Sequence, residues 1–360
     1  MTLIALHARG DVSAALSDIM VSGPDAGRFQ SIETPLSPYG NISLNSQQVG
    51  LTRKAHIINN DFLCLCSGDA LVAHSIVKTL SQEHVQDRLK DLNESVFSVL
   101  DEEYPENDLK KCGLIFSRCQ KISRNRVSQF NESSGVNFKR TDNEKIWIGG
   151  SGQEYYLNPD MHATFQGGLD HAWDTPREDV RKEQFAKIPT LLMTPELNET
   201  VAVSGFGGWY EMISFIGEKF QPKLYSFYKV VVRGKEVLPV IVIKPMYLDN
   251  GDLVLVRHVF EPNLAKMDVG TSIRYVPSLL NWPTSKGETI PGSAVSSLFR
   301  DRTNISLLFV EYLTGSNEVY LGSHVGIEEF VYATGPDDDV NWRVSDKVME
   351  LFTPESDPRN

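Results

Sequence analysis

The chain of 360 residues lacks the features that mark several classes of protein. No apolar run reaches the about 18 residues that a membrane-spanning helix needs. The N-terminus has no basic segment followed by a long apolar one, so no secretory signal peptide is expected. An excess of positive charge is also missing, because the formal net charge is −12. The sequence therefore predicts a cytoplasmic protein that binds neither nucleic acid nor an anionic membrane surface.

Cysteine is scarce, and the common catalytic and metal-binding motifs are absent. There is no His-Glu-x-x-His, no phosphate-binding Gly-x-x-x-x-Gly-Lys-Ser/Thr and no Gly-x-Ser-x-Gly. His162 and His171 flank a glycine-rich turn, but polar residues commonly collect in loops, so we expect no metal and no cofactor. The cysteines match no zinc-binding spacing and are expected to be reduced and buried in strands: Cys64, Cys66, Cys112 and Cys119.

The composition is that of a globular protein, with 41% hydrophobic and 23% charged residues. The length favours two domains or one elaborated domain. Apolar runs at 3–8 and 12–16, on either side of Gly10, predict a β-hairpin, and residues 54–67 predict a second one. Between the two hairpins, residues 22–51 are rich in Ser, Pro, Gly, Asn and Gln, which predicts a long loop.

The middle of the chain combines helices and strands. After Gly68, apolar residues at helical spacing predict two helices, over about 70–80 and 84–104. A charged helix is expected over roughly 176–194. Short apolar runs between these helices predict strands near 112–117, 135–138 and 146–148.

Strands dominate from about residue 223 onward. Residues 223–243 predict a hairpin, and Asn250-Gly251 is a strong turn signal for the next one. A further hairpin is predicted over about 305–332. We therefore divide the chain into a core of residues 1–245, which carries the 22–51 insertion, and a β-rich extension of residues 246–360 of unknown role.

The residue with the most chemical potential is Thr2, which opens the first apolar strand. Removal of Met1 would leave a threonine with a free α-amine. Its hydroxyl could then act as a nucleophile and its amine as the general base. An α-amine has a pKa of about 7.7–8.0, which suits it to accept a proton near neutral pH.

Four further places follow Thr2 in an order that favours this chemistry. Asp18 ends the second strand, where its carboxylate can keep a neighbouring lysine charged, and Lys54 begins the third strand. Gly68 ends the fourth strand and permits the close backbone approach that an oxyanion-binding N–H requires. Ser151 lies in Gly150-Ser151-Gly152 after a core strand. Each residue alone also has a simpler interpretation. Asp18 fits an ordinary strand end and Lys54 a surface lysine. Gly68 fits a turn, and Ser151 fits a linker.

This order of strands, helices and residues resembles the proteasome β-subunit branch of the N-terminal-nucleophile hydrolases, which includes the bacterial HslV protease. The resemblance covers about residues 2–245. It implies an α+β fold, a four-layer α/β/β/α sandwich with two antiparallel sheets face to face and helices outside. It also implies a threonine-type peptidase or amidohydrolase with these catalytic residues: Thr2, Asp18, Lys54, Gly68 and Ser151.

The resemblance further implies a substrate and an assembly. Met20, Val21 and Cys66 would line the pocket for the substrate side chain and favour an uncharged residue before the cleaved bond. The substrate would be a peptide or protein, and the chain would form a homo-oligomer, either a dimer or a ring. Whether an unfoldase or another partner takes part is open.

Three departures from the family pattern keep alternatives open. The stretch between Asp18 and Lys54 is longer than in typical members. Val203 and Phe206 stand where the family has an aspartate and a serine before a glycine pair, and Ser204 is the candidate replacement for orienting the amine. Met1 must also be removed. The alternatives are a catalytically inactive structural subunit, an assembly scaffold, or a binding module formed by the 246–360 extension.

Overall fold

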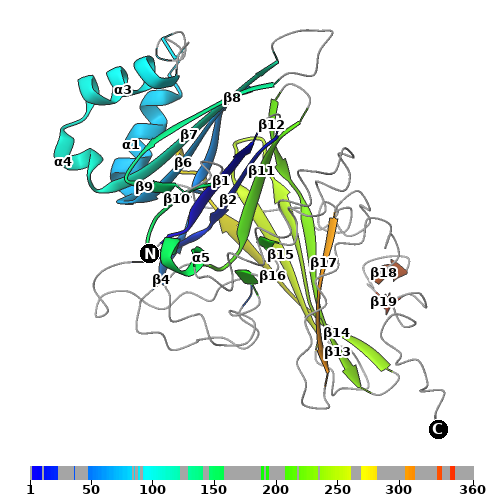
Figure 1. Ribbon diagram of the computed structural model, residues 1–360. Coiled ribbons are helices and arrows are strands. Elements are labelled where there is room, and N and C mark those ends of the chain that lie inside the picture. Colours follow the sequence, from blue (N-terminus) through cyan, green and yellow to red (C-terminus); the bar gives the residue numbers. More distant parts are fainter. Residues whose placement is uncertain are drawn as a thin grey trace.

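The computed structural model describes much of the chain up to residue 281 and three later strands (Figure 1). Strands outnumber helices among these residues, so the chain is a mixed α/β protein in which strands dominate. The described residues are 2–9, 12–22, 36, 48–82, 85, 88–89, 92–121, 129–140, 146–157, 188–189, 192–193, 207–216, 219–233, 236–260, 269–281, 305–312, 331–334 and 341–344.

The first predicted hairpin is confirmed and forms the centre of a six-stranded sheet, named here the N-terminal sheet. Successive side chains of its first strand point to opposite sides of the sheet, and both sides are buried. This explains why residues 3–6 form a continuous apolar run rather than an alternating pattern. The order is β12 (Lys219–Lys223), β11 (Tyr210–Ile216), β2 (Val12–Asp18), β1 (Ile4–Arg9), β10 (Ile146–Gly149) and β9 (Phe138–Arg140).

The second predicted hairpin is also confirmed and belongs to a four-stranded sheet, named here the helix-covered sheet. Leu63, Leu65 and Ile115 of this sheet share one buried core with Ile4 and Leu6 of the N-terminal sheet. The two sheets therefore pack face to face. The order is β5 (Ala55–Asn59), β6 (Phe62–Gly68), β7 (Cys112–Lys121) and β8 (Gln129–Val136).

Helices cover the other face of this sheet, at the upper left of Figure 1. They are α1 (Ala70–Leu80), α3 (Leu92–Glu103), which lies within the helix predicted over 84–104, and the short α4 (Glu106–Leu109). The Asp69 carboxylate caps α1 by accepting hydrogen bonds from two backbone N–H groups. The four cysteines are buried and free of disulfides, as predicted.

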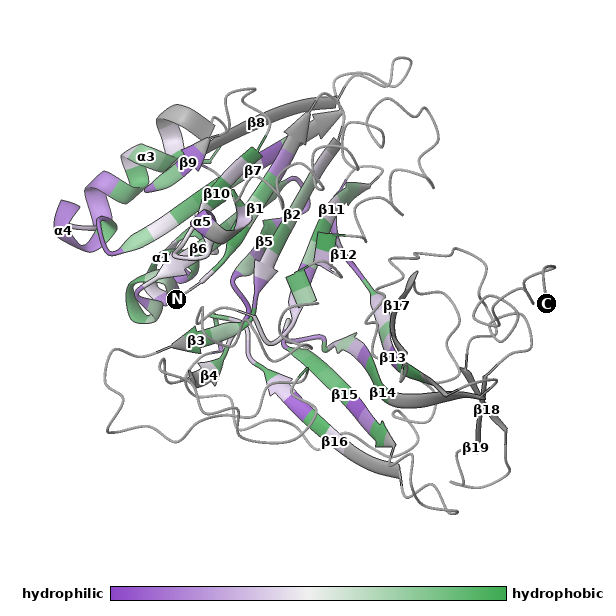
Figure 2. Ribbon diagram, turned by 60° about the horizontal axis from the view of Figure 1, so that its bottom comes forward, coloured by the Kyte–Doolittle hydropathy of each residue, from purple (hydrophilic) through white to green (hydrophobic). Residues whose placement is uncertain are grey.

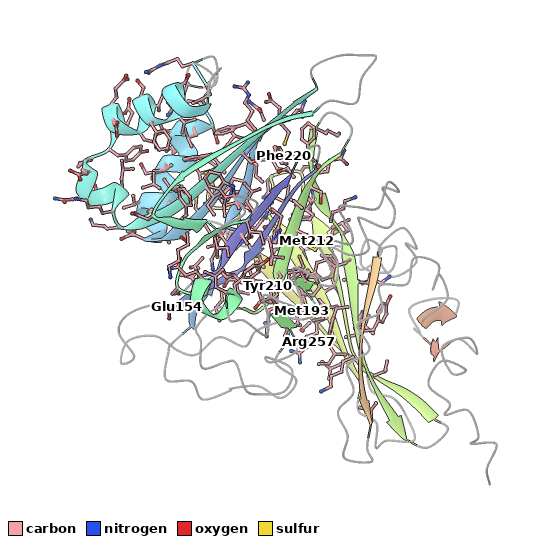
Figure 3. All side chains as sticks on the ribbon, in the orientation of Figure 1. Glu154, Met193, Tyr210, Met212, Phe220 and Arg257 are labelled. Carbon is pink, nitrogen blue, oxygen red and sulfur yellow. The ribbon has the colours of Figure 1, made fainter. Side chains whose placement is uncertain are left out.

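A third sheet, named here the C-terminal sheet, shares a buried core with residues on the outer side of the N-terminal sheet. Tyr210 and Met212 of β11 lie near Met193 (Figure 3), and all three share a core with Phe227 and Leu255 of the C-terminal sheet. Figure 2 shows a polar stretch between two apolar stretches in the strand of residues Leu253–Phe260 of this sheet. The order is β16 (Val269–Val276), β15 (Leu253–Phe260), β14 (Glu236–Tyr247), β13 (Tyr225–Arg233) and β17 (Ile305–Tyr312).

This packing leaves the predicted four-layer sandwich unconfirmed. One helical layer and two facing sheets are present in the described residues. On the remaining side the N-terminal sheet meets the short helix α5 (Gln153–Tyr156) and strands of the C-terminal sheet. The charged helix predicted over 176–194 lies largely outside the described residues, of which 188–189 and 192–193 are helical.

The C-terminal strands confirm two predicted hairpins. β13 pairs antiparallel with β14, and β14 pairs antiparallel with β15. β17 runs parallel to β13, while β18 (Val331–Thr334) pairs with β19 (Asn341–Val344). The hairpin predicted over 305–332 stays a prediction, because residues 313–330 lie outside the described residues. A parallel partner cannot be reached by a tight turn and leaves no local sequence signal. Residue 245 falls inside β14, and the division of the chain there stays a prediction.

The predicted long loop has a strand at each end. β3 (Met20–Ser22) pairs antiparallel with β4 (Gln48–Leu51), which brings the two ends of the loop together beside the start of β5. Residues 23–35 and 37–47, which make up most of this insertion, lie outside the described residues.

Candidate active site

Thr2 lies buried ahead of β1, and the turn after β10 wraps around it. The Thr2 nitrogen donates a hydrogen bond to Ser151 Oγ at 2.9 Å, and the Gly152 N–H donates to the Thr2 carbonyl at 2.9 Å. Gly150 has φ +85°, and a Cβ there would lie 2.2 Å from the Thr2 carbonyl oxygen. Only glycine permits this approach. The predicted Gly150-Ser151-Gly152 motif therefore contacts Thr2 directly.

Asp18 is fully buried and accepts four hydrogen bonds. Its Oδ1 accepts from the Leu3 N–H at 2.8 Å and from Lys54 Nζ at 2.7 Å. Its Oδ2 accepts from the Gly207 N–H at 3.0 Å and the Met20 N–H at 3.3 Å. A buried carboxylate requires such donors. Because Leu3 follows the candidate nucleophile, Asp18 joins the start of the first strand to the lysine.

Lys54 is held by Asp18 rather than by Thr2. Its ammonium donates to Asp18 Oδ1 and, at 2.5 Å, to the Met20 carbonyl oxygen. Burial lowers the pKa of Lys54 below its ordinary value, and the Asp18 carboxylate opposes that shift. Within the described part of the chain, no hydrogen bond joins Lys54 to the Thr2 hydroxyl.

Gly68 ends β6 in a conformation that requires glycine. Its φ is +94°, and a Cβ there would lie 2.1 Å from the Lys111 carbonyl oxygen. Among the described residues no hydrogen bond joins Gly68 to Thr2. Its role as an oxyanion-binding N–H stays a prediction.

The three predicted substrate-pocket residues lie in different settings. Met20 is buried, whereas Val21 of β3 is partly exposed. The Cys66 N–H donates to the Lys54 carbonyl at 2.8 Å, but its thiol lies under the helices, 3.4 Å from Cys64 Sγ. The hydrogen bond with Cys64 and burial raise the pKa of Cys66. A shared pocket for a substrate side chain stays a prediction.

The candidate for orienting the amine, Ser204, lies outside the described residues, as do Val203 and Phe206. The glycine pair that follows is described. Gly207 and Gly208 have φ values of +131° and +80°, so the chain turns in a way that favours glycine. Because the Gly207 N–H donates to Asp18, the pair meets the candidate site as the sequence order suggested.

The sequence did not single out the residue next to Lys54. Arg53 Nε and Nη2 donate to Glu211 Oε1 at 2.9 and 2.5 Å, and both side chains are buried. Arg53 Nη1 also donates to the Gly251 carbonyl oxygen, and its guanidinium lies 4.8 Å from the centre of the Tyr247 ring. Because 158 residues separate Arg53 from Glu211, no local pattern predicts this ion pair.

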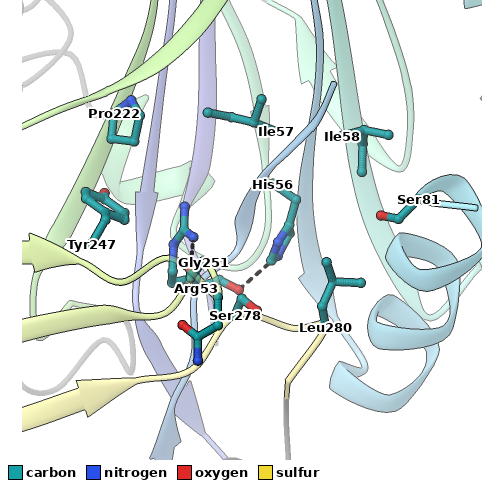
Figure 4. Close-up of a pocket in the computed structure, with 11 residues that line it drawn as sticks. Arg53, His56, Ile57, Ile58, Ser81, Pro222, Tyr247, Gly251, Ser278 and Leu280 are labelled. Carbon is teal, nitrogen blue, oxygen red and sulfur yellow. Dashed lines mark hydrogen bonds between the residues drawn. The ribbon is translucent and has the colours of Figure 1, made fainter. Parts of the chain in front are cut away.

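Arg53 also lines a cavity of about 270 Å³ (Figure 4). Its walls come from β5, β12, the end of α1 and the C-terminal sheet. Arg53 is neutralised by Glu211, and burial, together with the nearby Arg53 charge, lowers the pKa of His56 to about 3. At neutral pH these two side chains therefore give the cavity no uncompensated charge. The cavity lies where the N-terminal and helix-covered sheets meet the C-terminal sheet.

Two further features bear on function. Nowhere in the described ranges do three or more His, Cys, Asp or Glu side chains gather as a metal ion would require. Of the helices in those ranges, none has the length and apolar character needed to cross a membrane.

Comparisons with known proteins give a distant likeness among solved structures. No protein-family model and no curated protein sequence matches the chain. Among solved structures, the chain is similar to the eukaryotic HslV from Trypanosoma brucei, with a TM-score of 0.31 and 12% sequence identity. The match covers 59% of this chain and 98% of that one. A TM-score of this size defines neither the fold nor the activity of the chain.

Proposed function

We propose that the chain is an N-terminal-threonine hydrolase of the proteasome-like branch, a threonine-type peptidase or amidohydrolase acting on a peptide or protein. The observation that carries the proposal is the setting of Thr2. Ser151 Oγ lies 2.9 Å from its nitrogen, and Asp18 links the adjoining Leu3 N–H to the Lys54 ammonium. A buried lysine, carboxylate and hydroxyl at a strand start have the residue types that activate a threonine nucleophile.

In this mechanism Met1 is first removed. The Thr2 hydroxyl then attacks the substrate carbonyl carbon, and its own α-amine accepts the hydroxyl proton, directly or through water. The Lys54 ammonium stabilises the developing negative charge, and Asp18 keeps that lysine protonated against the effect of burial. The Gly68 N–H stabilises the oxyanion. The amine leaving group takes the proton, and water hydrolyses the resulting ester to return free Thr2.

The second candidate is an inactive structural subunit. Val203 and Phe206 favour it, because they stand where the resembled family has an aspartate and a serine. The Thr2 nitrogen also stays an amide for as long as Met1 is attached. An amide nitrogen has no basic lone pair and cannot accept the hydroxyl proton. In both candidates, self-association into a dimer or ring is part of the proposal.

Labelling with a peptidyl epoxyketone tests the function, because its ketone reacts with a hydroxyl and its epoxide with a free amine. We expect an adduct on the N-terminal peptide of wild type and none on Thr2→Ala, measured by mass spectrometry. Molecules in the same sample that retain Met1 serve as an internal control and should stay unlabelled. Complete retention of Met1 without any adduct favours the structural subunit, and equal labelling of wild type and Thr2→Ala excludes Thr2 as the nucleophile.

A further inference from the structure

The buried ion pair between Arg53 and Glu211 lies on the main-chain segments that carry the candidate catalytic pair. Arg53 directly precedes Lys54 in the chain. Glu211 stands opposite Ser17 in the pairing of β11 with β2, one position from Asp18. The ion pair therefore connects the neighbours of Lys54 and Asp18, and a shift of either charged side chain would move the backbone beside them.

The C-terminal sheet holds this ion pair in place. The Tyr247 hydroxyl of β14 donates to Glu211 Oε1 at 2.9 Å, and the Tyr247 ring packs on the Arg53 guanidinium. The turn between β14 and β15 accepts a hydrogen bond from Arg53 at the Gly251 carbonyl (Figure 4). After β16, the Pro277 carbonyl accepts from the Arg53 N–H at 2.9 Å. Three parts of the sheet thus meet at one residue.

A second tyrosine anchors the strand opposite Asp18. The Tyr225 hydroxyl of β13 donates to the Tyr210 carbonyl, and Tyr210 is the residue that pairs with Asp18 across β11 and β2. The rings of Tyr225 and Trp209 stack with centroids 4.6 Å apart. The C-terminal sheet therefore holds both sides of the Lys54–Asp18 contact, one through Arg53 and the other through β11.

Stability alone does not explain a charged pair at this place. Buried ion pairs often add little or nothing relative to apolar side chains of similar volume, because both charges lose their hydration. What such a pair does supply is a directional constraint, because the guanidinium donates in a fixed plane. Here that constraint acts on the residues next to Lys54 and Asp18.

We propose that Arg53 and Glu211 are positioning residues for Lys54 and Asp18, and that the C-terminal sheet is thereby a structural part of the active site. Their effect on catalysis rests on the proposed function, whereas their effect on the Lys54–Asp18 contact does not. Tyr247, Gly251 and Pro277 belong to the extension of residues 246–360. The catalytic residues of the core would therefore depend on that extension for their positions.

The decisive variant is Arg53→Met/Glu211→Leu, which removes both charges and keeps the side-chain volume close to that of wild type. We expect a protein that folds but whose epoxyketone labelling rate falls about 10- to 100-fold, the size of effect that small misplacements of catalytic groups cause. We also expect the pKa of Lys54, followed by NMR of lysine ¹³Cε, to fall further because its contact with Asp18 loosens. The Lys54→Met spectrum assigns the signal.

The matched control is Asp61→Asn, which breaks the partly buried ion pair between Asp61 and Arg118. Arg118 stands opposite Phe62, at the end of β6 far from Gly68. This variant should lose stability while the labelling rate and the pKa of Lys54 stay at wild-type values. A similar change in both variants would show a general effect of destabilisation and overturn the positioning role.

The remaining outcomes separate the two proposals. If the folded double variant keeps the wild-type pKa of Lys54, the positioning role is wrong, whatever the labelling shows. If wild type takes no label, the proposed function fails, and the NMR titration still decides the positioning role. If the double variant does not fold, Tyr247→Phe, which removes a single hydroxyl, replaces it; an unchanged pKa of Lys54 there would overturn the role.

Discussion

The helix-covered side of the sandwich and the end that meets the C-terminal sheet are filled by different kinds of side chain. Under α1 and α3 the core consists of aliphatic and aromatic residues and cysteines. Where the C-terminal sheet joins, several charged side chains are almost fully buried, among them Asp18, Arg53, Lys54 and Glu211. Apolar packing tolerates many arrangements, whereas a buried charge is stable only with specific partners. The contrast separates the part of the molecule that provides stability from the part built for orientation.

Removal of Asp18 is the largest expected perturbation of the charged region. Asp18→Ala leaves a buried ammonium without its carboxylate and removes the acceptor of three backbone N–H groups. Breaking a buried ion pair in this way costs about 3–5 kcal/mol in free energy of unfolding. Urea unfolding should show that loss, and epoxyketone labelling should disappear even under conditions where the variant is folded. A stable variant that labels normally would contradict both the structural role of Asp18 and its link to Thr2.

The helix-covered side should respond to truncation in stability alone. Leu100 of α3 is completely buried, so Leu100→Ala should lower the free energy of unfolding by about 2–5 kcal/mol through lost burial and a cavity. The labelling rate per folded molecule should stay at the wild-type value, because no charged partner of Lys54 has moved. A large fall in that rate would show that the two regions are coupled and would remove the distinction between them.

His56 differs from the buried charged residues of this region. It is a buried titratable residue on β5 that stays uncharged at neutral pH. Its pKa is about 3 in the folded chain, mainly because of burial, against 6.5 when unfolded. Below pH 6.5 the unfolded chain takes up a proton that the folded chain does not, so stability is lost as the pH falls toward 3. The expected slope from this group is about 1.4 kcal/mol per pH unit.

Urea unfolding of wild type and His56→Phe between pH 7.5 and 4.5 isolates that slope. The variant has no imidazole to protonate, so its stability should fall less steeply below pH 6.5. Identical slopes would show that His56 accepts a proton in the folded chain, and that the cavity beside it is more polar than its walls indicate.

Much of the local structure and the positions of the candidate site were predictable from the sequence. The two N-terminal hairpins follow from apolar runs with turn residues between them, and α1 follows from its helical spacing after Gly68. Asp18 and Lys54 were expected to meet, and they do. The second helical layer that the resemblance implies stays a prediction, because the helix expected over 176–194 lies largely outside the described residues.

The features that the sequence did not predict are contacts between residues far apart in the chain. Periodicity and turn chemistry act over a few neighbouring residues, and this is enough to order the strands, place Thr2 at the start of the first one and locate the glycine turns. The Arg53–Glu211 pair and the parallel pairing of β17 with β13 join residues far apart in the chain. Such contacts depend on how complete sheets pack together. Only that packing brings the C-terminal strands against the residues beside Lys54 and Asp18.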